Sequence, residues 1–111
     1  MKAASRAPAY AIIYHGLAEI ARRHGYALAI HGSLQTDLDL IAVPWVEDAT
    51  SAEVVIDALR THCQACLDLN GKVPVTEVKP HGRLAWNLYM GGGAKVDVSV
   101  LPRVLPVTVC R

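Results

Sequence analysis

The chain has 111 residues, of which 52% are hydrophobic and 19% are charged. This composition predicts one compact domain over residues 1–111 and excludes an intrinsically disordered chain. Eleven Lys and Arg against ten Asp and Glu give a net charge of +1, which argues against a surface that holds long nucleic acid by bulk electrostatics. The sequence has neither a signal-peptide pattern nor an apolar run of about eighteen residues, so we expect a soluble, cytoplasmic protein without membrane contact.

The N-terminal third predicts a helix followed by a strand. Apolar residues recur at helical spacing over 9–24, and Gly25 supplies the left-handed residue that closes many helices. Residues 26–30 are short, apolar and unbroken, which is typical of a central strand covered on both faces. This strand would deliver His31-Gly32-Ser33 at its C-terminal end.

A second strand and a second helix are predicted next. Residues 37–45 alternate as a strand does, with Asp37 and Asp39 on one face, and Pro44 ends the strand or confines it to an edge. Thr50-Ser51-Ala52-Glu53 matches a capping box and predicts a helix that continues to Asn70-Gly71.

Cys63 and Cys66 fall within that predicted helix. We interpret them as core residues, because no second ligand pair at zinc-like spacing accompanies them. Three cysteines cannot all pair within one chain, and we expect reduced thiols.

Two strand-like runs, 83–90 and 94–101, flank three glycines and predict a hairpin. Folding them about the middle glycine makes one face apolar and the other polar. The apolar pairs are Leu88–Val96, Trp86–Val98 and Leu84–Val100, and the polar pairs are Asn87–Asp97 and Tyr89–Lys95. We expect an extended tail over 102–111. The fold class is therefore α/β (α+β), a small mixed sheet with helices packed against it.

Three acids on two predicted strands could share a metal ion. Asp37 and Asp39 emerge from Cα atoms about 6.6 Å apart on one strand face, and Asp97 lies on the hairpin. Like charges this close repel unless a cation neutralises them. Mg²⁺ normally takes one or two carboxylates together with water and phosphate oxygens, so the pattern predicts a magnesium-dependent phosphate site.

The motifs His31-Gly32-Ser33, Asp37-Leu38-Asp39-Leu40 and Lys95-Val96-Asp97-Val98-Ser99 resemble the signature of the DNA-polymerase-β-like nucleotidyltransferase superfamily, in particular its minimal stand-alone members. The resemblance spans residues 30–100. It implies a nucleotidyltransferase that binds a nucleoside triphosphate, such as ATP, with Mg²⁺ or Mn²⁺ and transfers a nucleotidyl group to a hydroxyl of a protein, an RNA or a small molecule.

The resemblance also implies roles for individual residues. Asp37, Asp39 and Asp97 would be the catalytic and metal-binding residues, with Asp97 acting as a ligand or as the base for the acceptor hydroxyl. Gly32 and Ser33 would contact the triphosphate. Only residues 34–36 separate Ser33 from Asp37, where most of the family has a longer insert with a basic residue. Lys95, or Arg83, could replace that positive charge.

Two other readings remain open. The chain could be a catalytically inactive member of the same fold, such as an interaction module, an antitoxin-like partner or an accessory subunit, which binds a partner protein; a homodimer is also possible. It could also be an unrelated small α/β protein whose acids bind calcium or nothing. His31 could contact a phosphate or only end its strand, and Asn87 could join the site or only form a cross-strand hydrogen bond.

Overall fold

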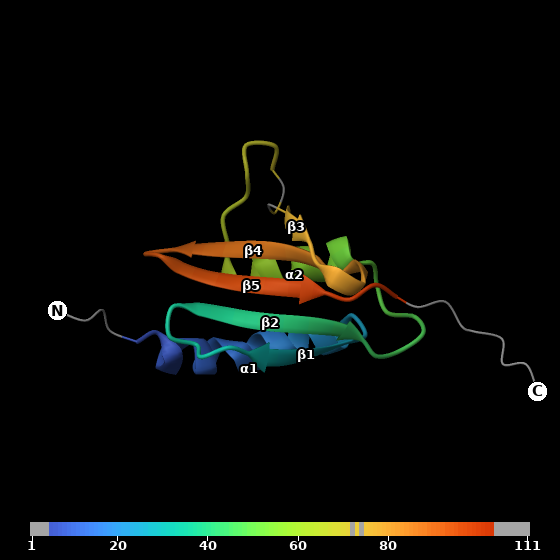
Figure 1. Ribbon diagram of the computed structural model, residues 1–111, viewed down its shortest axis with the longest axis horizontal. Helices are drawn as coiled ribbons and strands as arrows, with labels where there is room; N and C mark the ends of the chain where they lie inside the picture. Colours follow the sequence, from blue (N-terminus) through green and yellow to red (C-terminus); the bar gives the residue numbers. More distant parts are fainter. Residues whose placement is uncertain (1–4, 72, 74, 104–111) are drawn as a thin grey trace, which may run out of the picture.

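The computed structural model describes residues 5–71, 73 and 75–103 (Figure 1). Its elements, in chain order, are α1 (Ala7–Arg23), β1 (Tyr26–His31), β2 (Asp37–Pro44), α2 (Ala52–Cys63), β3 (Val75–Val78), the 3-10 turn η1 (Pro80–Gly82), β4 (Leu84–Gly91) and β5 (Ala94–Val100). The strands form one sheet in the order β1-β2-β5-β4-β3. β2 and β5 are parallel and the other neighbours are antiparallel, so the predicted small mixed sheet with packed helices is confirmed.

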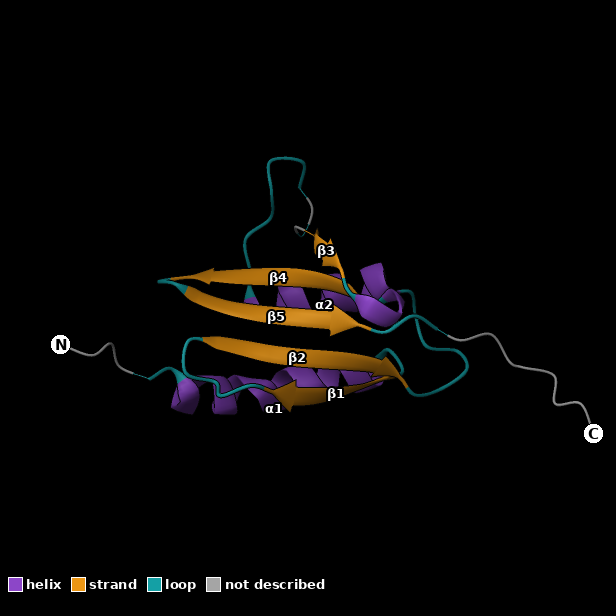
Figure 2. Cartoon of the chain, viewed as in Figure 1, coloured by secondary structure: helices purple, strands orange, loops and turns teal. Residues whose placement is uncertain are grey.

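Both helices cover the same face of the sheet, as Figure 2 shows, and leave the other face open. Alternation along each strand explains this, because every second side chain of β2 and β5 is apolar and turns toward the helices. The core comprises residues from both layers, among them Tyr10, Leu17, Leu38, Leu40, Ile56, Leu59, Trp86, Leu88, Val96 and Val98. The polar residues of β2, β4 and β5 therefore lie on the open face.

The first helix and strand follow the predicted positions, but β1 is not a central strand. Among the described strands it pairs only with β2, and it forms an edge of the sheet. α1 covers Tyr26 and Leu28, whereas Ala27 and Ala29 are exposed on the open face. Alanine adds little apolar area to a surface, so an unbroken apolar run need not be buried on both faces.

The predicted hairpin is confirmed residue by residue. β4 and β5 pair in the predicted register, with Leu88 opposite Val96 and Asn87 opposite Asp97, and the register shifts only at the glycine turn. Trp86 is 4% exposed and belongs to the apolar layer, as predicted.

Both predicted ends of the second helix are wrong. The N-cap of α2 is Ser51, whose Oγ accepts the Val54 N–H, and not Thr50. The helix ends at Cys63, where Gln64 adopts a left-handed conformation. Cys66 lies beyond the helix and is exposed, and its backbone N–H donates to the Tyr89 carbonyl. Apolar residues continue the helical spacing past Cys63. The backbone nevertheless leaves the helix, because the Cys66 N–H bonds to β4 instead.

β3 has no counterpart in the sequence prediction, because a four-residue strand with a register irregularity carries too short an alternation to detect. The predicted tail lies mainly outside the described residues, which end at Arg103. Within the part of the chain that the structure describes, neither helix has the length and apolar content needed to cross a bilayer.

Candidate metal and nucleotide site

Four polar residues form a row across the open face of the sheet. His31 of β1 is the register partner of Asp39 of β2, Asp39 is the partner of Asp97 of β5, and Asp97 is the partner of Asn87 of β4. Neighbouring strands are about 4.8 Å apart, and register partners direct their side chains to the same face. The polar row, defined by these four residues, therefore brings the carboxylates of Asp39 and Asp97 side by side.

Asp37 lies outside the polar row, two residues along β2. Its register partner is Lys95, and the Lys95 Nζ lies 3.4 Å from Asp37 Oδ2. Burial lowers the pKa of the Lys95 amine, but the Asp37 carboxylate outweighs burial, and the net pKa is raised. Asp37 therefore forms an ion pair with Lys95, whereas Asp39 lies opposite another carboxylate, that of Asp97.

The charge state of Asp97 reflects its crowded position. Burial raises the pKa of the Asp97 carboxyl, and the neighbouring Asp39 carboxylate raises it further. Lys95, Lys79 and His31 oppose this shift without cancelling it. Two carboxylates on a half-buried surface are therefore short of positive charge, which is the condition a divalent cation relieves.

The Gly-Ser turn lies next to Asp39. Gly32 has a φ of +83°, and a Cβ added there would lie 2.7 Å from Asp39 Oδ2. Only glycine permits this approach of backbone to carboxylate. Ser33 is exposed, and its Oγ accepts the N–H of Gln35. The predicted phosphate-contact residues thus adjoin the predicted metal ligands.

α1 and the residue before it hold the loop between β1 and β2 in place. The Tyr10 hydroxyl donates to the carbonyl of Thr36 (2.6 Å) and accepts the backbone N–H of Lys95 (3.1 Å). The Arg6 N–H donates to the carbonyl of Gln35. One buried tyrosine therefore joins the loop after β1 to the start of β5, and both segments carry candidate site residues.

Cationic side chains surround the acids. Lys95 lies beside Asp37, and Arg83 Nη1 donates to Ser99 Oγ (3.3 Å), on the same strand face as Asp97. Lys79, just after β3, is close enough to lower the pKa of Asp97. Sequence reasoning named Lys95 and Arg83 but missed Lys79, because Lys79 follows a strand whose alternation is too short to reveal its face.

The residues present fit a hard cation, although not with the predicted set of three acids. Within the described ranges, no three His, Cys, Asp or Glu side chains are placed to share one metal ion. Asp39 and Asp97 offer two carboxylates, and Asn87 adds an amide in the same row. The Asn87 Oδ1 is buried and accepts no hydrogen bond from any described residue. Carboxylate and amide oxygens are ligands of Mg²⁺, Mn²⁺ and Ca²⁺.

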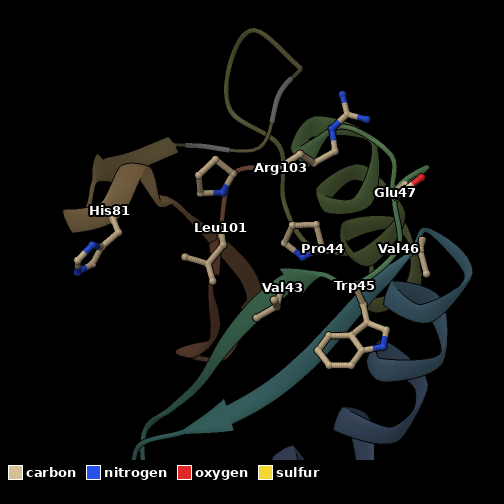
Figure 3. A pocket seen from close by; sticks show the side chains of 9 residues that line it. Val43, Pro44, Trp45, Val46, Glu47, His81, Leu101 and Arg103 are labelled. Carbon is tan, nitrogen blue, oxygen red and sulfur yellow. The ribbon is translucent and has the colours of Figure 1, made fainter. Parts of the chain in front are cut away.

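A separate hollow of about 400 Å³ lies at the other end of β2 (Figure 3). Val43, Pro44 and Leu101 line its apolar floor, with His81 on one side and Trp45 on the other. Val43 is four residues beyond Asp39, or about 13 Å along the strand, so the hollow is distinct from the polar row.

No protein-family model and no curated protein sequence matches this chain.

Proposed function

We propose that the chain is a metal-dependent nucleotidyltransferase-like protein, which binds a nucleoside triphosphate with Mg²⁺ on the open face of the sheet and transfers a nucleotidyl group to an acceptor hydroxyl. The observation that carries this proposal is the parallel pairing of β2 with β5, which sets Asp39 beside Asp97 and next to the Gly32 turn. The site of action would be the cytoplasm.

Asp39 and Asp97 would hold the cation, for which Mn²⁺ could substitute. A bound divalent ion neutralises charge on the triphosphate and helps to align it for in-line transfer. The chain's own residues would do the positioning. The backbone at Gly32 and the exposed Ser33 hydroxyl would contact the phosphate oxygens, and Lys95 would add a positive charge on the same face.

Asp97 is also suited to receive a proton. Without a bound cation, burial and the Asp39 carboxylate raise the pKa of the Asp97 carboxyl, so the Asp97 carboxylate is then a stronger base than that of an ordinary aspartate. As the acceptor oxygen bonds to the α-phosphorus and pyrophosphate leaves, the acceptor hydroxyl would pass its proton to Asp97. Because a cation bound to Asp97 would lower its pKa, Asp97 would act either as a metal ligand or as the base.

One observation favours a second function, that of a catalytically inactive module of the same fold which binds a partner protein. Lys95 pairs with Asp37, one of the three predicted acids, and only residues 34–36 separate the Gly-Ser turn from β2. Under this alternative the open face, or another surface, would bind a protein and no nucleotide would be transferred.

Calorimetry tests the proposed site directly. The protein is titrated with Mg²⁺ and each common nucleoside triphosphate, and the titration is repeated for Asp39→Asn and for the control Asp48→Asn, which changes an exposed acid in the turn before α2. We expect metal-dependent binding that Asp39→Asn abolishes and Asp48→Asn preserves. Absence of metal-dependent binding in the unsubstituted protein would refute the proposal.

A transfer assay separates the two functions. Nucleoside triphosphates labelled at the α-phosphate are incubated with Mg²⁺ and candidate protein, RNA and small-molecule acceptors. Label on an acceptor, lost in Asp97→Asn, supports the enzyme. Metal-dependent nucleotide binding without transfer to any acceptor, together with a stable protein complex, supports the inactive module.

A further inference from the structure

Asn87 has a buried side-chain oxygen to which no described residue donates a hydrogen bond. The residue is 6% exposed, and its Oδ1 accepts no hydrogen bond from any residue that the structure describes. Its Nδ2 donates to the Tyr89 hydroxyl at 3.2 Å. Buried amide oxygens are nearly always satisfied by protein, water or an ion, so this atom calls for a ligand.

The position of Asn87 in the sheet indicates where that ligand would bind. Asn87 is the register partner of Asp97, and Asp97 is the partner of Asp39, so three oxygen-bearing side chains follow one another on β4, β5 and β2. Asp97 is in the middle. A cation held by its carboxylate is therefore next to both the Asn87 amide and the Asp39 carboxylate.

Asp37 is less well placed to complete this set. It lies about 6.6 Å along β2 from Asp39, and its carboxylate pairs with Lys95 at 3.4 Å. Binding the same ion through Asp37 would bring it close to the Lys95 amine, and the two positive charges would repel each other. No donor among the described residues bonds to Asn87 Oδ1, and this oxygen is neutral, so it adds a ligand without adding repulsion between carboxylates.

We propose that Asn87 Oδ1 is a ligand of a divalent cation held by Asp39 and Asp97, and that Asp37 positions Lys95 instead of binding this ion. The inference rests on the proposed function for the purpose of the cation, but cation binding itself is measurable without nucleotide. It changes the predicted ligand set from three acids to two acids and an amide. In this arrangement Asp37 holds the Lys95 amine at the edge of the site, where the amine could bind a phosphate.

The same atoms allow one purely structural explanation. If the amide is turned over, Oδ1 accepts from the Tyr89 hydroxyl and Nδ2 is free to donate to a neighbour such as Asp97, so that Asn87 serves only to satisfy its neighbours. The two explanations differ in what substitutions do. A ligand oxygen survives in Asn87→Asp and is lost in Asn87→Leu, whereas a donor to Asp97 is lost in both.

Mn²⁺ binding to the nucleotide-free protein, followed by electron paramagnetic resonance, is the test. We expect Asn87→Leu to weaken Mn²⁺ affinity by about tenfold or more, the range found when groups supporting a metal are removed. Asn87→Asp should retain or increase the affinity, and Asp37→Asn should weaken it less than Asn87→Leu does. The matched control is Ser99→Ala, which removes a buried hydroxyl from β5 on the same sheet face as Asn87. We expect this variant to bind Mn²⁺ as the unsubstituted protein does.

A second measurement covers the case in which Asn87→Leu does not fold. Titration of the unsubstituted protein with diamagnetic Mg²⁺ should shift the side-chain amide resonances of Asn87, and Mn²⁺ should broaden them. The proposal is overturned if these resonances do not respond, if Asn87→Asp loses Mn²⁺, or if Asp37→Asn loses more affinity than Asn87→Leu. It is equally overturned if the unsubstituted protein binds no Mn²⁺.

Failure of the proposed function gives a different result. Asn87-dependent Mn²⁺ binding without any binding of nucleoside triphosphates would leave the ligand assignment standing and refute the nucleotidyltransferase site. Metal-dependent nucleotide binding that Asn87→Leu leaves intact would refute the ligand assignment alone.

Discussion

Asp97 shows how one residue couples the candidate site to stability. Its folded-state pKa is raised, because burial and the Asp39 carboxylate both disfavour the charged form. The folded protein therefore binds more protons at Asp97 than the unfolded chain does, at any pH between the ordinary aspartate pKa of about 3.9 and the raised value. Across that window the free energy of unfolding falls as pH rises.

Asp97→Asn should remove this contribution. We expect the variant to gain stability over the unsubstituted protein at neutral pH without metal, and the gain to shrink as pH falls toward about 3.9. Urea denaturation from pH 4 to 8 in the presence of a chelator measures the difference. A gain that does not depend on pH would mean that charge at Asp97 is not its cause.

Gly32 is a second residue whose backbone geometry should affect both stability and binding at the candidate site. Gly32→Ala would place a methyl group against Asp39 Oδ2 at a φ of +83°, and the left-handed backbone alone costs about 1–2 kcal/mol. Gly91→Ala is the matched control, since Gly91 has a φ of +81° and nothing lies within 4 Å of an added Cβ. Urea denaturation should show a loss for both variants, and calorimetry should show weakened Mg²⁺ and nucleotide binding for Gly32→Ala only.

At the level of elements, α1 does more than cover the sheet. The Tyr10 hydroxyl links the loop after β1 to the first residues of β5, so removing it should loosen both sides of the site. We expect Tyr10→Phe to lower the free energy of unfolding by about 1–2 kcal/mol and to weaken nucleotide binding.

Tyr14→Phe provides the comparison for that experiment. The Tyr14 hydroxyl donates to the carbonyl of Leu28, within β1 and away from the loop. Both variants lose a hydroxyl that α1 directs at a backbone carbonyl, but only Tyr10→Phe should change affinity. Equal effects of the two variants on affinity would show that α1 acts through general stability and not through the loop.

A strand was predictable from the sequence where its hydrophobic pattern matched that of the strand it pairs with. The register of the β4–β5 hairpin was predicted correctly outside the turn, because folding about the middle glycine makes one face apolar and places Asn87 opposite Asp97, whereas the strand ends differ from the prediction by one residue. The end of α2 was not predicted correctly, because Gln64 takes the left-handed position usually held by glycine. The pairing that replaces the helix, from Cys66 to Tyr89, is a tertiary contact that helical spacing cannot reveal.

The site was predictable to the same extent. Alternation placed Asp37 and Asp39 on one face of β2 and Asp97 on the polar face of the hairpin, but only the parallel register of β2 with β5 makes Asp39 and Asp97 neighbours. The sequence does not reveal that Lys95 pairs with Asp37, since that contact depends on which residues of β2 and β5 are partners. The relative shift of two strands distant in the chain is set by packing, and the shift decides which acids meet.

For the whole molecule, the net charge of +1 conceals an uneven distribution of charge. The helices cover one face of the sheet with apolar contacts, while the open face carries three acids among Lys95, Lys79 and Arg83. On this face Asp39 and Asp97 repel each other without a cation, and a bound cation together with the basic residues would attract phosphate. Binding and folding should therefore be linked, and the link can be measured without knowledge of the acceptor.

We expect Mg²⁺ together with the preferred nucleoside triphosphate to raise the Tm of the protein. A ligand at about one hundred times its Kd adds about 2.7 kcal/mol to stability, which for a chain of this size corresponds to a rise of roughly 10 °C. Differential scanning calorimetry with Mg²⁺ alone, nucleotide alone, both, and both with excess chelator separates the contributions. Asp39→Asn should abolish the rise, and Asp48→Asn should retain it, because only Asp39 lies in the polar row. A rise that survives Asp39→Asn or the chelator would place the ligand elsewhere on the molecule, with the hollow beside Trp45 the next surface to examine by substitution.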